Sequence, residues 1–355
     1  MRCQIQLKIK NSLIQQKTIM YVKRDVPLWL MAMFAWKSII IYLLLSGTVW
    51  SLYHFLDCKF LAIPFLPVGM VGTAVAFYVG FKNNSAYDRL WEARRIWGSI
   101  TNISRTWATW ANTWSGAWGD KQASAEVAAY RKELIYRQIA WINTLRIRLR
   151  NTPIFEENYF QKGAQFKATE KHRLDLQEDL KSVFCFLTRK HEIEQIKAAK
   201  HHGNFLLTQQ SRTLVEMKQK GILTEFEHSD LEKMVLECYN QQGACERIKS
   251  FPLPRQYATF STIFVKIFIF LLPFGIIKEA DEIGSSWIMI PFSVLISWIF
   301  YTMEQIGDSS ENPFENSIND VPMSAICRNI EIDLREMLGE TELPAKIAAK
   351  DGILM

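Results

Sequence analysis

The chain has 355 residues, of which 49% are hydrophobic and 13% aromatic, including 12 Trp and 22 Phe. This composition favours membrane segments and argues against two ordinary soluble cores. The formal net charge of +6 comes with basic flanks around the apolar segments, so it does not indicate a nucleic-acid partner.

Residues 1–27 are basic, and we expect them to form a cytoplasmic N-terminal tail. They lack the compact charged, apolar and small-residue regions of a cleavable signal peptide, so export is not expected. A more typical beginning is found at Met20, so residues 1–19 are either a flexible tail or the product of an upstream start.

Four apolar runs have the length of a membrane helix, for which a bilayer requires about 20 residues. They cover residues 38–56, 60–81, 260–277 and 287–301, and the last is short enough to extend into its flanks. We expect a transmembrane hairpin over residues 28–81 and a second one over residues 256–303. Lys and Arg crowd the segments before the first run and after the second, which places both termini and residues 82–255 in the cytoplasm.

The second run is the most informative feature, because it continues without a helix stop into a charged, aromatic stretch that reaches residue 98. At helical spacing, one ridge of small residues would let neighbouring helices approach closely, and it consists of Gly72, Ala76 and Gly80. The adjacent ridge, about 100° round the helix, consists of Thr73, Phe77 and Phe81. Where several copies converge, these three positions would form a narrow apolar neck. Packing or lipid contact is the alternative role for the same side chains.

Residues 87–97 mix charged side chains with two tryptophans. They fit either ion pairs at i,i+3 and i,i+4 on a solvated helix face or an inter-subunit or vestibule surface. The pattern from residue 82 to 255 is helical nearly throughout, which predicts a cytoplasmic helical domain inserted between the hairpins.

Two helices of that domain are marked by local signals. Apolar residues within 127–149 recur at intervals of three and four, while arginines that include Arg137 mark a basic side. Thr224 fits the N-cap of a helix that begins near Phe226. Residues 304–355 follow the last span as an acidic cytoplasmic loop and a C-terminal helix over 323–338.

The acidic loop contains weak candidates for a calcium site, Asn312 and Asp320. Serine and asparagine residues interrupt the acids, which favours a capped solvent loop over a metal site. The sequence carries no phosphate-binding glycine loop, nucleophile elbow or paired-carboxylate motif. We therefore expect neither an enzyme nor a cofactor.

Three stretches resemble the signature regions of the bestrophin family, in its prokaryotic branch, and occur in the same order. They are GFKNNSAYDRLWEARRIWG (80–98), GACERIKSFPLPRQY (243–257) and ENPFENSINDVP (311–322). The resemblance implies an all-α, polytopic membrane protein with four transmembrane helices and a large cytoplasmic helical domain. It also implies a homopentameric ion channel around a central pore, in the bilayer of a bacterial cytoplasmic (inner) membrane.

By this resemblance the neck rings fall on Thr73, Phe77 and Phe81, the positions that helical spacing also selects. The cytoplasmic aperture falls on Phe226, with Glu227 and Ser229 as alternatives because the alignment there is looser. Animal members hold Ca²⁺ through a run of consecutive acids after Asn-Pro-Phe, and this chain has too few acids there for the same activation.

The sequence is compatible with selectivity for either anions or cations. Prokaryotic relatives tend to carry aliphatic residues at the first two neck positions, where this chain has Thr73 and Phe77. Branch resemblance favours monovalent cations such as sodium, whereas the positive ring edges of Phe77 and Phe81 suit anions such as chloride and tip the balance slightly. The alternative function is a membrane-anchored scaffold whose cytoplasmic helical domain docks a soluble partner, which the sequence does not identify.

Overall fold

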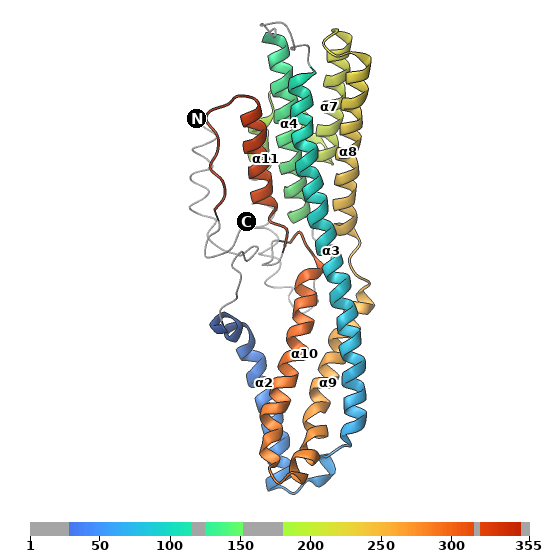
Figure 1. Cartoon of the computed structure of the whole chain (residues 1–355), viewed down its shortest axis with the longest axis vertical. Coiled ribbons are helices and arrows are strands. Elements are labelled where there is room, and N and C mark those ends of the chain that lie inside the picture. The colour runs from blue at the N-terminus through green and yellow to red at the C-terminus, as the bar shows by residue number, and fades with distance from the viewer. Residues whose placement is uncertain (1–27, 115–124, 152–179, 316–319, 349–355) are drawn as a thin grey trace. The chain divides into compact units, whose positions relative to one another are not determined.

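The computed structural model describes residues 28–114, 125–151, 180–315 and 320–348, which fold into helices without any β-strand (Figure 1). The tail expected over residues 1–27 lies outside the described residues. The chain divides into two compact units. We call residues 23–91 and 252–312 the span unit, and residues 92–251 with 313–355 the inserted unit.

The span unit contains α2 (Leu28–Phe55), the first part of α3 (Phe65–Thr113), α9 (Arg255–Glu282) and α10 (Met289–Glu311). Four stretches of the described residues are long and apolar enough to cross a membrane: Ala35–Phe55, Lys59–Thr113, Arg255–Glu282 and Ser286–Glu311. Each of them overlaps one of the four predicted runs. The fourth run extends into its flanks, as its short length allowed.

Helix α3 is a single helix of 49 residues. Its only proline, Pro67, lies in the first turn, where a missing N–H leaves no intrahelical bond unmade. Because no further helix breaker follows, the apolar segment passes directly into the charged segment. The prediction that the second membrane run continues without a stop is confirmed.

The core of the span unit is apolar and is built from four helices. Val68, Val75 and Val79 of α3 pack against residues of α9 that include Phe268 and Leu272. Helix α2 adds Tyr42, and α10 packs along both α2 and α9. Many large apolar side chains remain exposed on the outside of these helices, as a lipid environment allows.

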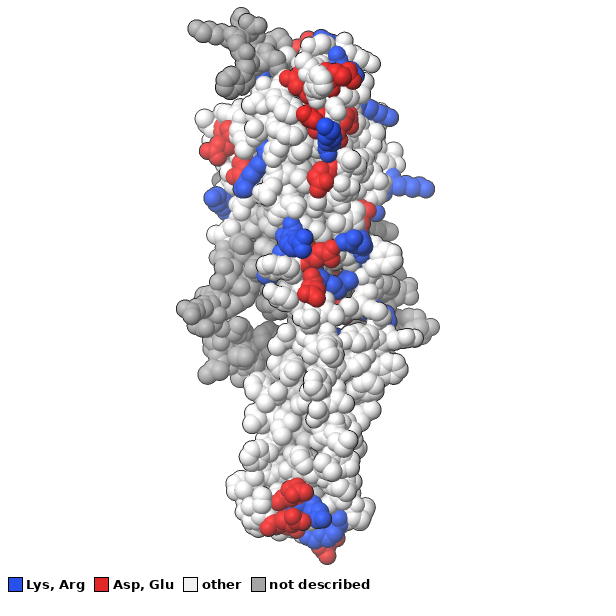
Figure 2. Space-filling model, turned by 45° about the vertical axis from the view of Figure 1, so that its right-hand side comes forward, with Lys and Arg blue, Asp and Glu red and all other residues white. Residues whose placement is uncertain are grey.

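In Figure 2, Lys, Arg, Asp and Glu gather at the lower tip of the molecule, and the band directly above this tip shows almost none of them. At the short connections, Lys59 Nζ lies 3.6 Å from Asp281 Oδ2, which also accepts a 3.0 Å hydrogen bond from the Tyr53 hydroxyl. The charge-free band with a charged end is the surface that a membrane-spanning bundle requires.

The inserted unit comprises the second part of α3 with α4 (Ala125–Asn151), α6 (Lys190–Ala198), α7 (His202–Gln219), α8 (Glu225–Ser250) and α11 (Met323–Met337). Helix α4 packs against α7 and α11, and α7 packs against α8. Its interior includes three fully buried tryptophans, Trp97, Trp107 and Trp141. The indole of Trp141 donates to Gln242 Oε1 at 3.0 Å, so this buried N–H is satisfied.

The predicted start of α8 is confirmed in detail. Thr224 accepts a hydrogen bond from the backbone N–H of Glu227, whose carboxylate accepts in return from the Thr224 backbone, completing a capping box. Gly221, just before it, has a φ of +70°, a conformation that glycine adopts without strain. The C-terminal helix α11 likewise lies where the sequence predicts it.

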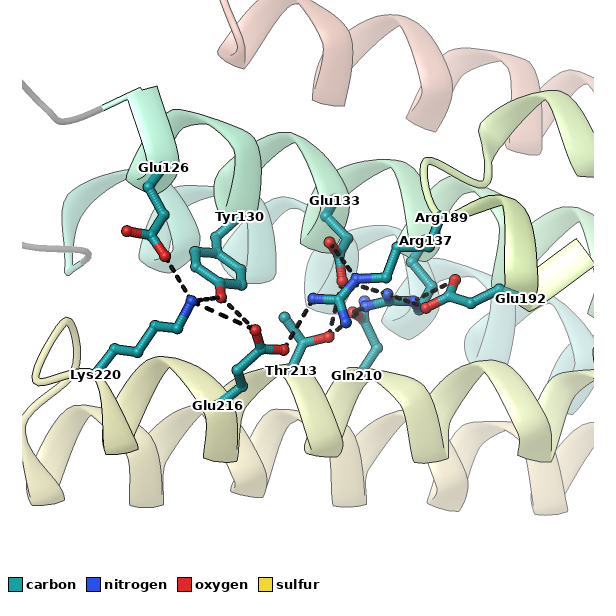
Figure 3. Close-up of polar contacts among 10 residues, drawn as sticks. All are labelled: Glu126, Tyr130, Glu133, Arg137, Arg189, Glu192, Gln210, Thr213, Glu216 and Lys220. Carbon is teal, nitrogen blue, oxygen red and sulfur yellow. Dashed lines mark hydrogen bonds and ion pairs between the residues drawn. The ribbon is translucent and has the colours of Figure 1, made fainter.

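The expectation that Arg137 lies on a basic side of α4 is wrong. Its side chain is 1% exposed and is enclosed by α6 and α7 (Figure 3). Arg137 Nη2 donates to Glu133 Oε1 at 2.5 Å and to Glu192 Oε1 at 2.6 Å, while Nη1 donates to Gln210. A charge this deeply buried persists only because nearly every donor finds an acceptor.

Candidate functional site

The predicted neck residues share an exposed face of α3. Phe77 and Phe81 are 65% and 66% exposed, although they are large apolar side chains. Thr73 is also exposed, and its hydroxyl donates to the carbonyl oxygen of Gly69 one turn earlier at 3.0 Å. Together with Asn84, these side chains line one open hollow on the surface of α3. No other described helix of this single chain covers that face.

The three small residues of the neighbouring ridge differ in how far they are buried. Gly72 is buried, and a Cβ at that position would lie only 2.6 Å from the ring of Phe268 on α9. Ala76 is half-buried, and Gly80 is exposed, with nothing within 4 Å of the point where a Cβ would lie. Gly72 therefore serves packing within the chain, whereas Gly80 leaves room beside the aromatic face for another molecule.

The orientation of that face is set by contacts on the opposite side of α3. Val75 and Val79 are buried in the core of the span unit, which turns Phe77 and Phe81 outward. Tyr78 lies between these two directions and packs against the Tyr257 ring, with centroids 4.8 Å apart. The helix is thus held along one side only.

Immediately after Phe81, a buried ionic cluster joins α3 to α9 and α10. Lys82 is fully buried, and its Nζ lies 2.6 Å from Glu304 Oε1 and 2.5 Å from Asp308 Oδ1. Glu304 also accepts hydrogen bonds from the hydroxyls of Ser261 (2.6 Å) and Thr262 (2.8 Å) of α9. Every group that faces Glu304 in this cluster is a donor, so its charge is compensated.

Two further polar contacts continue along the same side of α3. Asn83 donates to the backbone carbonyl of Met303 at 2.9 Å, and its side chain is so close to Gly307 that a Cβ there would lie 2.1 Å from Oδ1. Arg89 Nε donates to the backbone carbonyl of Glu311 at 3.0 Å. These contacts bind α3 to α10 past the end of the apolar segment.

Sequence reasoning missed the Lys82 cluster. From the sequence, Lys82 was expected to be one of several basic residues in the cytoplasm, and Glu304 was expected to begin the acidic loop. A signal was present: Lys82 follows Phe81 directly, and Glu304 closes the fourth apolar run, so both charges border membrane helices and need partners.

Residues 87–97 do not rely on ion pairs within their own helix. Arg89 contacts α10, as described above, and Glu92 forms an ion pair with Arg247 of α8. Asp88 and Trp91 are exposed on the outside of α3. These contacts do not fit ion pairs within a single solvated helix face, and an inter-subunit or vestibule surface stays a prediction.

The predicted aperture residue, Phe226, is 84% exposed in the first turn of α8. The capping box at Thr224 and Glu227 fixes the backbone there, so the ring projects from a rigid helix end. Glu227 is committed to this cap, which leaves Phe226 the freer of the two side chains.

The two calcium candidates belong to different units of the chain. Asn312 ends α10, and its buried Oδ1 accepts no hydrogen bond from the described residues. Asp320 is 1% exposed, and the nearby Lys249 is a buried cation 3.6 Å from Glu315. Residues 316–319 lie outside the described residues, and the rest of the described chain contains no group of three His, Cys, Asp or Glu side chains arranged for a metal.

The inserted unit holds a second ionic network, between α4, α6 and α7 (Figure 3). Arg189 bridges Glu133 (2.9 Å) and Glu216 (3.0 Å), and Glu216 also accepts from the Tyr130 hydroxyl. Burial raises the pKa of Glu133, but Arg137, Arg189 and Thr213 outweigh it and hold the pKa below its usual range. The network is saturated with partners, so it stabilises the packing of these helices and offers no open coordination site.

The fold and the exposed face define a polytopic, all-helical membrane protein with one long helix free along an aromatic stripe. A family model described as "Bacterial/Fungal Bestrophin protein" matches residues 28–336, and the chain belongs to the bestrophin family. The resemblance inferred from the three signature stretches is therefore confirmed.

Several known proteins are similar to this chain along most of its length. The voltage-dependent anion channel-forming protein YneE of Escherichia coli K12 is 27% identical over 332 residues, covering 90% of this chain and 94% of its own. The protein of the same name from Salmonella typhi is 28% identical over 297 residues, covering 83% and 82%. The crystal structure of a bacterial bestrophin homolog from Klebsiella pneumoniae shares the fold, with a TM-score of 0.69 at 22% identity, covering 85% of this chain and 97% of that one.

Proposed function

We propose that the protein is an ion channel of a bacterial cytoplasmic membrane, in which five copies place the α3 face of Thr73, Phe77 and Phe81 around a central pore. The observation that carries this proposal is the exposure of two phenylalanines, 65% and 66%, on a membrane-length helix whose other side is firmly packed. The names of the relatives support a channel, and the family resemblance supports the number five.

The continuation of the face favours a pore over contact with lipid. The stripe passes from Phe77 and Phe81 to Asn84 and Asp88 without turning away. A lipid-facing stripe would end at the membrane boundary, whereas a path for ions needs an apolar constriction that opens into a polar, hydrated space. The same side of one helix supplies both.

A lysine on α9 supports assembly into an oligomer. Lys266 is exposed, and its neighbours at helical spacing are Ile263 (40% exposed) and Phe270 (55%), while the adjacent Ile267 is 46% exposed. Exposing an ammonium group to lipid hydrocarbon has an unfavourable free energy. A second copy that covered this face would shield Lys266 from the lipid.

In this proposal the two units have distinct roles. The span unit supplies the neck, the inserted unit lies in the cytoplasm with both termini, and Phe226 lines a second constriction there. Permeant ions are small and monovalent. The names of the relatives support anions such as chloride, while the branch resemblance leaves cations such as sodium as the alternative.

Reconstitution into liposomes tests the proposal. The purified protein should have the native mass of a pentamer and should conduct ions. Its reversal potential in asymmetric NaCl should show whether anions or cations permeate. The membrane-anchored scaffold would be supported instead by two results together. Well-folded oligomers would show no ion flux, and a pull-down would recover a soluble protein only when residues 120–250 are present.

A further inference from the structure

Between Thr73 and Trp91, one charged residue lies on the aromatic face of α3. From Thr73 to Trp91 the helix carries three charged side chains, Lys82, Asp88 and Arg89. Asp88 follows Phe81 by about two helical turns, or roughly 10 Å, and therefore points in nearly the same direction. It is exposed, as are Phe77, Phe81 and Asn84.

The other two charged side chains point away from that face and contact α10. Lys82 is fully buried against Glu304 and Asp308 of α10. Arg89 is half-buried and donates to the Glu311 carbonyl of the same helix. Asp88 forms no ion pair with a described residue, so between Thr73 and Trp91 its carboxylate is the net charge on the open side.

We propose that Asp88 is a specificity-determining residue, which supplies a ring of negative charge at the inner mouth of the neck. This inference rests on the proposed function, since only an assembly around the α3 face repeats the residue around one axis. Each permeating ion would pass the ring directly after the apolar constriction formed by Phe77 and Phe81. The ring attracts cations and repels anions, so it opposes any preference for anions that the aromatic edges create.

The size of the effect depends on distance and screening. Five unit charges within about 8 Å of a hydrated ion, partly screened at physiological salt, would alter the cation-to-anion permeability ratio about tenfold. The Debye length grows from about 8 Å at 0.15 M salt to about 30 Å at 0.01 M. The influence of a fixed charge must therefore grow as the salt concentration falls.

The test is the reversal potential of purified, reconstituted protein in asymmetric NaCl, for wild type, Asp88→Asn, Asp88→Glu and Asp88→Lys. We expect Asp88→Asn to shift permeability toward chloride about tenfold, Asp88→Lys to shift it further, and Asp88→Glu to match wild type. The shift should be larger in dilute salt. A merely structural role for Asp88 would change the amount of current without this dependence on charge and salt.

Glu194→Gln provides the matched control, because it removes the same charge from an exposed side chain of α6. Its reversal potential should equal that of wild type. Wild-type current with an unchanged reversal potential in Asp88→Asn and Asp88→Lys would overturn the role of Asp88 and leave the channel standing. Absence of current from every variant, wild type included, would overturn the channel and with it the inference.

Discussion

Lys82 Nζ lies 2.6 Å from Glu304 Oε1, and the two side chains are 0% and 2% exposed. They join α3 to α10 one residue beyond Phe81. Because the hydroxyls of Ser261 and Thr262 complete the coordination of Glu304, the pair fixes the rotation of α3 against both neighbouring helices. This ionic pair therefore helps to hold the aromatic face in the direction that the packing of Val75 and Val79 gives it.

Lys82→Met should lower the free energy of unfolding by about 3–5 kcal/mol, because it leaves the buried carboxylate of Glu304 without its cation. Thermal unfolding of the purified protein in detergent measures the loss. Lys278→Met is the control, since the pair of Lys278 with Glu282 is exposed and contributes about 0–1 kcal/mol. Equal effects of the two substitutions would show that the buried pair is not structural.

Gly72 and Gly80 should respond oppositely to alanine. Gly72→Ala forces a methyl group against the Phe268 ring and should destabilise the protein by about 1–3 kcal/mol. Gly80→Ala meets nothing within 4 Å in the chain and removes a flexible residue from a helix, so it should leave folding intact or improve it by up to about 1 kcal/mol. Denaturation in detergent compares them. If Gly80→Ala folds but fails to assemble, Gly80 contacts a neighbouring copy.

The stability of the inserted unit should fall in acid through Glu133. The folded-state pKa of Glu133 is held below its unfolded value, so its ionised form stabilises the fold above the unfolded pKa and that stability is lost as pH falls through the folded pKa. Glu133→Gln should thus be less stable than wild type at pH 7, and the gap should narrow on acidification. Unfolding curves recorded from pH 7 to pH 3 measure it. A gap that stays constant with pH would contradict this role.

Phe226 and Leu236 provide a matched pair on α8, because they are 84% and 60% exposed. If Phe226 lines a cytoplasmic constriction, Phe226→Ala should change the conductance or the selectivity among anions of different size. Leu236→Ala removes a comparable exposed apolar side chain and should leave both unchanged. Currents recorded with a series of anions distinguish them, and identical behaviour of the two variants would remove Phe226 from the ion path.

The course of α3 was predictable from sequence because its determinants are local. An apolar run without an internal proline, followed by residues with good helical periodicity, has no reason to stop, and the ridges follow from helical spacing. The cap at Thr224 was predictable for the same reason, since its partner Glu227 lies three residues away.

The ionic clusters were not predictable, because their partners are distant in sequence. Lys82 and Glu304 are 222 positions apart, and only the packing of α3 on α10 brings them together. Arg137 stands at helical spacing among other arginines and therefore resembles a solvated residue; its burial depends on Glu192, which lies 55 positions further along the chain. The neck and aperture residues themselves stay predictions, because their roles require the assembled channel.

The most direct test of the channel is the current through planar bilayers that contain purified wild-type protein or the double variant Phe77→Ala with Phe81→Ala. A dewetted apolar neck limits conduction, so shortening both side chains should widen and hydrate it. We predict measurable current from wild type and a clearly larger or less gated current from the double variant. No current from well-folded wild-type oligomers, or the same current from both proteins, would contradict a pore lined by this face of α3.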